Sequence, residues 1–212
     1  MFARINKIVW VMVVTDFFVN SAFGSFAPVF AIFITGQITG GSAKVAGFAA
    51  SVYWITKSLV QLPIARFLDR SATENRHFWA MFLGYFFSAF TPFAYLFVTE
   101  PWQLYATQAA LGICMAWAVP AWYSIFTTHV DKWRVSFEWS LESVFAVGAA
   151  TAAATAIGGF IADRFGFDIL FIAAGILAVV SSLLLLIMRR EIFSQPPVKI
   201  EQVLPERHHR RH

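Results

Sequence analysis

Charged residues and cysteines are both scarce in this chain, and each scarcity limits the classes of protein to which it can belong. Only 13% of its 212 residues are Asp, Glu, Lys or Arg, whereas a soluble globular domain has about 25%. Its single cysteine, Cys114, has no intrachain partner for a disulfide, so packing is its expected role. The remainder is apolar, with 58% hydrophobic residues and a mean hydropathy of +0.65. This composition is typical of an integral membrane protein.

Motifs for nucleotide, metal and hydrolytic chemistry are also missing from the sequence. It contains no GxxxxGK[ST] phosphate-binding loop, which argues against ATP-driven transport within this chain. It contains neither an HExxH metal pattern nor a GxSxG nucleophile elbow. An intramembrane enzyme built on Asp16 or Glu142 has no positive sign in the sequence. We therefore expect no enzymatic activity, no cofactor and no metal site.

Apolar runs long enough to cross a bilayer account for nearly the whole chain. A helix needs about 20 residues to cross the hydrocarbon core. Six runs qualify, with expected bounds of 8–34, 45–67, 78–98, 102–127, 139–162 and 169–188. We expect an all-α membrane protein with one six-helix transmembrane domain over residues 1–190. Residues 191–212, which contain three prolines and a basic His-rich end, should form a disordered cytoplasmic tail.

Lys and Arg are distributed unevenly between the two sets of connecting segments. If the N-terminus is inside, nine of them fall on inner segments and two, Lys44 and Arg164, on outer loops. The positive-inside rule then places both termini in the cytoplasm, in a plasma or inner membrane. The same asymmetry explains the net charge of +4, so no nucleic-acid partner is expected. The inner residues are Arg4, Lys7, Arg66, Arg70, Arg76, Lys132, Arg134, Arg189 and Arg190.

Two charged residues, Asp16 and Lys57, lie in the middle of the first and second runs. A charge near the bilayer centre costs several kcal/mol and usually faces a bundle interior, where it marks a substrate or ion path. Counted at about 1.5 Å per residue, the two lie at similar depth, so an ion pair between neighbouring helices is geometrically reasonable. Such a pair either binds substrate or protons, or only locks the two helices together.

Further polar residues share the faces of these charges. Asn20 follows Asp16 by four residues, and Gln61 follows Lys57 by four, so each pair lies on one helix face. We expect Asn20, Gln61 and Gln108 of the fourth run to be polar neighbours of the charged pair. Glu138 and Glu142 repeat the spacing at the inner end of the fifth run. There we expect a gate or a loop contact.

The other runs differ in what their surfaces can contact. The third and sixth have no charged residue in their interiors and are rich in Phe, Leu and Ile, as expected of lipid-facing helices. The fifth contains a small-residue stretch from Gly148 to Gly159. Small residues let helix backbones approach closely in lipid. That stretch should meet another helix at short distance.

A weak internal repeat relates the two halves of the chain. Leu68-Asp69-Arg70 ends the second run, and Ala162-Asp163-Arg164 ends the fifth. Pro28 and Pro120 lie toward the ends of the first and fourth. Two three-helix units of inverted topology are a transporter signature, with the binding site near the bilayer midplane.

The order of the runs and their loops resembles the amino-terminal six-helix half of the major facilitator superfamily over about residues 8–188. The loop from Ala65 to Arg70, with Arg76 beyond it, is similar to the family's G-x-x-x-D-R-x-G-R-R loop. The connection from Gly158 to Phe167 is similar to the family's link between helices five and six. The short basic loop 131–134 also matches. The resemblance implies gating or loop roles for Arg66, Asp69, Arg70, Arg76 and Arg134.

The sequence also departs from the family pattern. Ala65 replaces the loop's first glycine, and Gln108 occupies a helix-four position where many proton-coupled members have arginine. The usual member has twelve helices, and this chain has six expected ones. A half transporter needs a second half. A homodimer through the second and fifth helices is the simplest completion. A separately encoded second half or a fragment of a longer gene are the alternatives.

Two functions remain open at this point. The first is secondary active transport of a small solute by alternating access, with possible proton coupling through Asp16. The second is a non-transporting membrane subunit or scaffold that retains the fold, in which the Asp16–Lys57 pair is structural. The resemblance favours transport. Membrane lipids and a small-molecule substrate are then the expected partners, and the sequence does not identify the substrate.

Overall fold

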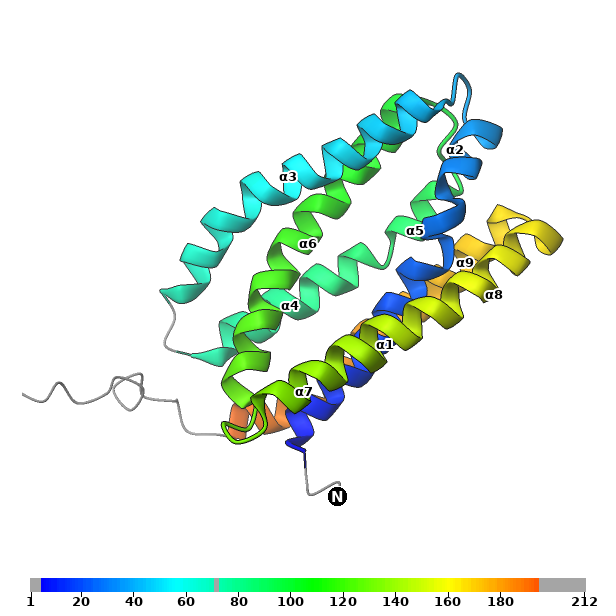
Figure 1. The fold of residues 1–212 in the computed structure, drawn as a ribbon. Helices are drawn as coiled ribbons and strands as arrows, with labels where there is room; N and C mark the ends of the chain where they lie inside the picture. The colour runs from blue at the N-terminus through cyan, green and yellow to red at the C-terminus, as the bar shows by residue number, and fades with distance from the viewer. Residues whose placement is uncertain (1–4, 71–72, 195–212) are drawn as a thin grey trace, which may run out of the picture.

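The computed structural model describes residues 5–70 and 73–194 of the chain, and these residues contain helices and no strands. Successive passes of the chain run in alternating directions along one elongated bundle (Figure 1). The elements in order are α1 (Lys7–Phe26), the 3-10 turn η1 (Ala27–Val29), α2 (Phe30–Gln37), α3 (Ala43–Asp69), α4 (Glu74–Ser88), α5 (Thr91–Tyr95), α6 (Pro101–His129), α7 (Val135–Leu141), the π-helix η2 (Glu142–Ala149), α8 (Ala150–Phe165) and α9 (Phe167–Ser194).

The helices form two groups that α4 joins. On one side α6 packs between α3 and α4, and on the other α1 packs against both α8 and α9 (Figure 1). Contacts between α4 and α9 connect the groups. The larger apolar core fills this junction and includes Met12, Phe78, Phe126 and Met188. The expected all-α class is confirmed for the part of the chain that is described.

Two of the expected uninterrupted runs are broken. The first, 8–34, contains the 3-10 turn η1 around Pro28, and α2 bends away from α1 beyond it (Figure 1). The third, 78–98, is divided into α4 and α5 around Ala89 and Phe90, just before Pro92. Proline lacks the backbone N–H that an α-helix needs and its ring crowds the preceding turn, which accounts for both breaks.

The fifth and sixth runs also differ in detail from the expectation. The fifth begins at Val135 and changes from α to π geometry at Glu142 before it continues as α8. The sixth extends as α9 to Ser194, so the first four residues of the expected tail are helical. The remainder of that tail, from residue 195, lies outside the described residues.

Four helical stretches are long and apolar enough to cross a membrane: Lys7–Gln37, Pro101–His129, Val135–Phe165 and Phe167–Arg190. Helix α3, with 27 residues, has sufficient length, but Lys57 and other polar residues reduce its apolar character. Helix α4 has 15 residues, fewer than the about 20 that a straight crossing requires. These four stretches indicate a membrane protein that crosses the bilayer several times.

The small-residue stretch of α8 packs inside the same chain. Ala150, Ala154 and Gly158 are buried, one turn apart, along the face that meets α1. A Cβ atom at Gly158 would overlap the backbone carbonyl of Ser25. On α8 the hydroxyl of Thr155 donates to the Gly24 carbonyl at 3.3 Å. The close helix contact expected from the sequence is therefore formed, and its partner is α1.

This contact leads to a prediction about stability. Gly158→Leu should lower the free energy of unfolding by at least about 2 kcal/mol, because the new side chain has no space against α1. Gly36→Leu is the matched control, since nothing lies within 4 Å of a Cβ atom there. Thermal unfolding of the purified protein in detergent measures both. Equal melting temperatures for the two variants would contradict the α1–α8 packing.

Candidate functional site

A cavity of about 220 Å³ lies between α1, α4, α6 and the segment formed by α7 and η2. It combines two carboxyl groups with aromatic walls. Among the described residues that line it there is no Lys, Arg or His. Its lining residues are Asp16, Asn20, Tyr85, Val119, Trp122, Tyr123, Trp139, Glu142 and Val147.

Asp16 lies on the inward face of α1 and is almost fully buried, with 8% of its surface exposed. The Tyr85 hydroxyl of α4 donates a hydrogen bond to Asp16 Oδ1 at 3.3 Å. The Asn20 side-chain amide donates to the backbone carbonyl of Asp16 at 2.9 Å. Burial inside a helix bundle removes most hydrating water, so these protein groups have to replace it. Asp16 and Asn20 therefore share the face that the sequence predicts.

Glu142, the first residue of η2, faces Asp16 across the cavity. Both carboxyl groups line the cavity and lie close enough for their charges to interact. An ionised carboxylate has only hydrogen-bond acceptors, so a hydrogen bond between two carboxyl groups requires a proton on one of them. The structure thus places Glu142 at the same cavity as Asp16, whereas the sequence favoured a gate or loop contact for it.

The segment η2 is a π-helix, so the fifth pass departs from regular α-helical geometry over these residues. A π-helix bonds residue i to residue i+5, and such segments occur frequently at functional sites. Here the segment is held against α1 by Phe145, whose ring stacks on that of Phe17 with centroids 4.8 Å apart. Glu142 and Asp16 are therefore presented by two elements that pack directly on each other.

Lys57 lies away from this cavity, and the expected Asp16–Lys57 ion pair is not formed between these two described residues. The Lys57 ammonium instead lies over the rings of Trp54, at 4.9 Å from the centroid, and Tyr53, at 5.8 Å. Its helix, α3, packs on α6 at Gly112, where a Cβ atom would come within 2.8 Å of the Tyr53 carbonyl. Aromatic faces attract cations, so they compensate part of the cost of this charge.

The other two predicted polar neighbours are not at the cavity either. Gln108 is buried on α6, one turn before Gly112, and Gln61 is partly buried on α3. Neither belongs to the lining of the Asp16 cavity. Of the five predicted substrate or proton residues, the structure brings together Asp16 and Asn20. Binding roles for Lys57, Gln61 and Gln108 stay predictions.

The predicted loop residues collect at the end of the bundle where α1 begins and α6 ends (Figure 1). Glu138 is buried and its Oε2 accepts a hydrogen bond from the Asp131 backbone N–H at 3.1 Å, which fixes the loop between α6 and α7. Arg134 lies 4.0 Å from Asp131 in the same loop. The Nε2 atom of His129 lies 3.5 Å from Glu74 and joins α6 to α4.

The loop after α3 holds the remaining predicted residues. Arg76 donates to the Phe67 carbonyl at 3.2 Å, and its guanidinium lies 4.8 Å from the centre of the Phe67 ring. This contact ties the start of α4 to the end of α3. Arg66, Asp69 and Arg70 are exposed at the end of α3. Gating roles for these residues stay predictions.

Sequence reasoning missed Tyr85, which lies in a Phe-rich run that is expected to face lipid. One face of α4 is buried, and Tyr85 points from it into the cavity with 6% of its surface exposed. The available signal was its hydroxyl in the middle of an otherwise apolar span, next to Gly84. Tyr123 and Trp139, which form the aromatic walls together with Trp122, were also not assigned to this site.

The Tyr85 hydrogen bond can be tested by removing one oxygen. Tyr85→Phe should lower the free energy of unfolding by about 1–3 kcal/mol, because the buried Asp16 carboxyl loses its donor. Tyr123→Phe is the matched control, since Tyr123 lines the same cavity and is half-exposed. Chemical or thermal unfolding in detergent measures the difference. The assignment is wrong if the two substitutions have the same effect.

Comparison with known families gives a match over nearly the whole chain. The family model described as Major Facilitator Superfamily matches residues 9–211. This confirms the resemblance drawn from the loop motifs and the order of the helices. No curated protein matches the chain.

Proposed function

We propose that this chain, which belongs to the major facilitator superfamily, is a secondary active transporter that moves a small solute by alternating access with proton coupling. Members of the family are generally transporters, and the four membrane-spanning stretches agree with that activity. The observation that supports proton coupling is the pair of carboxyl groups, Asp16 and Glu142, in one cavity of the bundle.

The proton would be shared between these two carboxyl groups. Two carboxylates at close range repel each other, and a shared proton removes that repulsion in the way known for other carboxylate pairs. Tyr85 donates to the same oxygen cluster from a third helix. Loss of the proton would leave two negative charges facing each other in an apolar surrounding, so α1 and η2 would then favour a different spacing.

This dependence is what a coupled transporter needs. A proton or a solute shifts a conformational equilibrium only by as much as its affinity differs between the two states. In the structure the two carboxyls belong to different packed elements, so their separation changes whenever those elements move. We propose that protonation favours the packed state seen here and that deprotonation favours the alternative access state.

The solute would contact the polar residues near this cavity and on α3. Asn20 lines the cavity, and Lys57 provides a half-buried cation on α3. Together with Gln61 and Gln108 they are proposed as substrate-side residues. The cavity of about 220 Å³ is below the usual 300–1,000 Å³ for a small-molecule site, so the solute site would be completed in another state or by a second half.

Uptake into proteoliposomes tests the proposed coupling. Asp16→Asn should reduce solute accumulation driven by an imposed pH gradient by at least about tenfold, since the shared proton is lost. Glu142→Gln should have the same effect, and Asp163→Asn, at the far end of α8, is the matched control. A solute panel with and without the gradient provides the assay. Unchanged uptake and pH dependence in Asp16→Asn would assign the pair a structural role.

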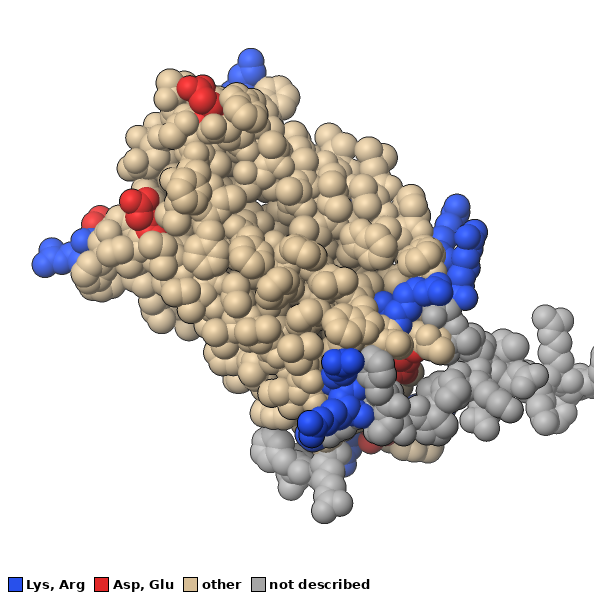
Figure 2. Space-filling view, turned by 180° about the vertical axis from the view of Figure 1, so that it is seen from behind, with Lys and Arg blue, Asp and Glu red and all other residues tan. Residues whose placement is uncertain are grey.

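We further propose six membrane spans with both termini in the cytoplasm. The support is the distribution of Lys and Arg together with the alternating direction of successive passes (Figure 1). On the face shown in Figure 2, charged side chains lie at opposite ends of a broad uncharged belt. Helix α3 and the pair α4–α5 would cross the membrane in addition to the four apolar stretches. Their contacts with α6 would shield part of their surfaces from lipid.

Single-cysteine labelling in intact cells tests this topology. In a Cys114→Ser background, cysteines at Lys44 and Thr99 should react with an impermeant maleimide added outside, because both lie in outer loops. A cysteine at Arg70 should react only after the membrane is opened. Labelling of position 70 from outside would refute the orientation.

The working unit is proposed to be a homodimer of these half-size chains through α3 and α8, in one membrane with twelve helices. While Ala150, Ala154 and Gly158 pack on α1, Ala152, Ala153 and Ala156 form a second small-residue face of α8 that is exposed. Helix α3 is also largely exposed on the side away from α6, including Trp54, Leu59 and Leu62. These surfaces fit a close contact between two copies.

Ala153→Leu should separate the subunits, because a larger side chain prevents close approach of the exposed α8 face of one copy to α3 of the other. Mass measurement in nanodiscs gives the subunit number, with Ile157→Leu as a control of similar size on the same helix. A monomer that still transports solute would contradict the dimer proposal. A stable complex with a different protein would indicate a separately encoded second half.

A further inference from the structure

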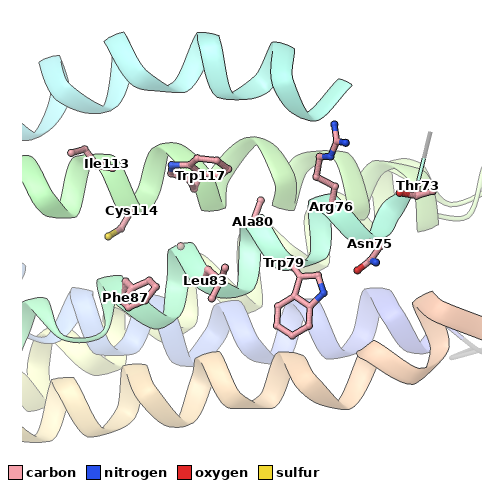
Figure 3. Close-up of a pocket in the computed structure, with 11 residues that line it drawn as sticks. Thr73, Asn75, Arg76, Trp79, Ala80, Leu83, Phe87, Ile113, Cys114 and Trp117 are labelled. Atoms are coloured by element: carbon pink, nitrogen blue, oxygen red, sulfur yellow. The ribbon is translucent and has the colours of Figure 1, made fainter. Parts of the chain in front are cut away.

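A second and larger cavity, of about 720 Å³, lies on a different face of α4 from the carboxyl pair. Leu83 lines it, whereas Tyr85, two residues later and about 200° further round the helix, points to Asp16. The cavity is a groove between α4 and α6 that begins near the loop after α3 (Figure 3). Its volume is within the about 300–1,000 Å³ that is usual for ligand sites.

The groove has an apolar floor and apolar walls along most of its length. At Gly84 a Cβ atom would come within 2.6 Å of the Cys114 carbonyl, so the backbones of α4 and α6 nearly touch beneath it. Leu83, Phe87 and Ile113 are exposed by 43%, 56% and 45% of their surfaces. An exposed apolar groove on a membrane helix is open to hydrocarbon chains from the side.

One end of the groove is polar and cationic. Thr73, Asn75 and Arg76 gather there at the start of α4, while Phe87, Ile113 and Cys114 lie at the other end (Figure 3). The Arg76 guanidinium lies over the Phe67 ring and donates one hydrogen bond to the Phe67 carbonyl. A guanidinium has five N–H donors, so Arg76, which is among the lining residues, has donors beyond the one used by Phe67.

Two charged residues near the groove also bear on its charge: Arg189 is a second cation, and Glu74 is an acid whose side chain points to another partner. The Arg189 guanidinium lies 5.2 Å from the ring centre of Trp79, which lines the groove. The neighbouring acid, Glu74, is directed to His129 at 3.5 Å and is not among the lining residues. Among the described lining residues there is no Asp or Glu. The mouth therefore complements a negatively charged group.

We propose that this groove binds an anionic phospholipid of the inner leaflet, with its phosphate at Arg76 and one acyl chain along Leu83, Phe87 and Ile113. The apolar lining suits an acyl chain, and the cationic mouth suits a phosphate, which an arginine can bind through two N–H groups. Basic pockets between transmembrane helices on the cytoplasmic side bind anionic headgroups by the same chemistry. The binding is independent of the proposed transport activity.

The single cysteine of the chain lies inside the groove and provides a native reporter. The rate at which N-ethylmaleimide alkylates Cys114 is measured on the purified full-length protein in micelles containing phosphatidylglycerol or phosphatidylcholine. Phosphatidylglycerol should slow the reaction about fivefold more than phosphatidylcholine, since one basic residue at an anionic surface contributes about that factor. Glycerol phosphate or inorganic phosphate, which lack acyl chains, should give no protection.

Matched variants assign the effect to the groove mouth. Arg76→Gln should abolish the difference between the two lipids, and Arg66→Gln, a cation of the same loop region outside the lining, should preserve it. Native mass spectrometry of the unmodified protein should show preferential retention of phosphatidylglycerol that Arg76→Gln removes. Equal protection or retention by both lipids, an unchanged preference in Arg76→Gln, or protection by free phosphate would each overturn the proposal.

Discussion

A carboxyl group buried in an apolar helix bundle must be compensated by its neighbours, and this requirement organises the region around α1. Asp16 receives the Tyr85 hydroxyl from α4 and faces Glu142 from η2, so three elements meet at one acidic centre. The same helix is tied to α9, where the Ser181 hydroxyl donates to the Thr15 carbonyl at 2.8 Å. Close packing of α8 at Gly158 completes the support. Movement at any of these contacts changes the surroundings of the carboxyl pair.

Lys57 and the carboxyl pair lie in separate places within the bundle. Lys57 is stacked on Trp54 and Tyr53 of its own helix, whereas the carboxyl pair is confined to the junction of α1, α4 and η2. If Asp16 were paired with Lys57, the ammonium would favour the ionised carboxylate, so Asp16 would take up a proton less readily. Under the proposed function, this separation leaves the carboxyl pair available for a proton and Lys57 available for a solute. This division of roles fits coupled transport better than a locked helix pair.

The sequence predicted those features that depend on local composition, and it failed where geometry between helices decides. Run length and apolarity located the helices, and the loop motifs led to the family, because both are local properties. Pro92 divided a run whose apolar character was continuous. The partner of Asp16 depended on which helix lies beside α1, and α3 packs on α6 instead. Tyr85 lies in a run of phenylalanines, so its hydroxyl did not stand out as a site residue. The π geometry that begins at Glu142 has no simple sequence signal.

Infrared difference spectroscopy of the purified protein tests the shared proton most directly. The C=O stretch of a protonated carboxyl group is separate from that of a carboxylate, so a spectrum recorded between acidic and alkaline pH reports which groups exchange protons. A proton shared by Asp16 and Glu142 predicts one protonated-carboxyl band that disappears or shifts in both Asp16→Asn and Glu142→Gln and persists in Asp163→Asn. A spectrum in which neither substitution alters that band would contradict the account, since the two carboxyl groups would then hold no common proton.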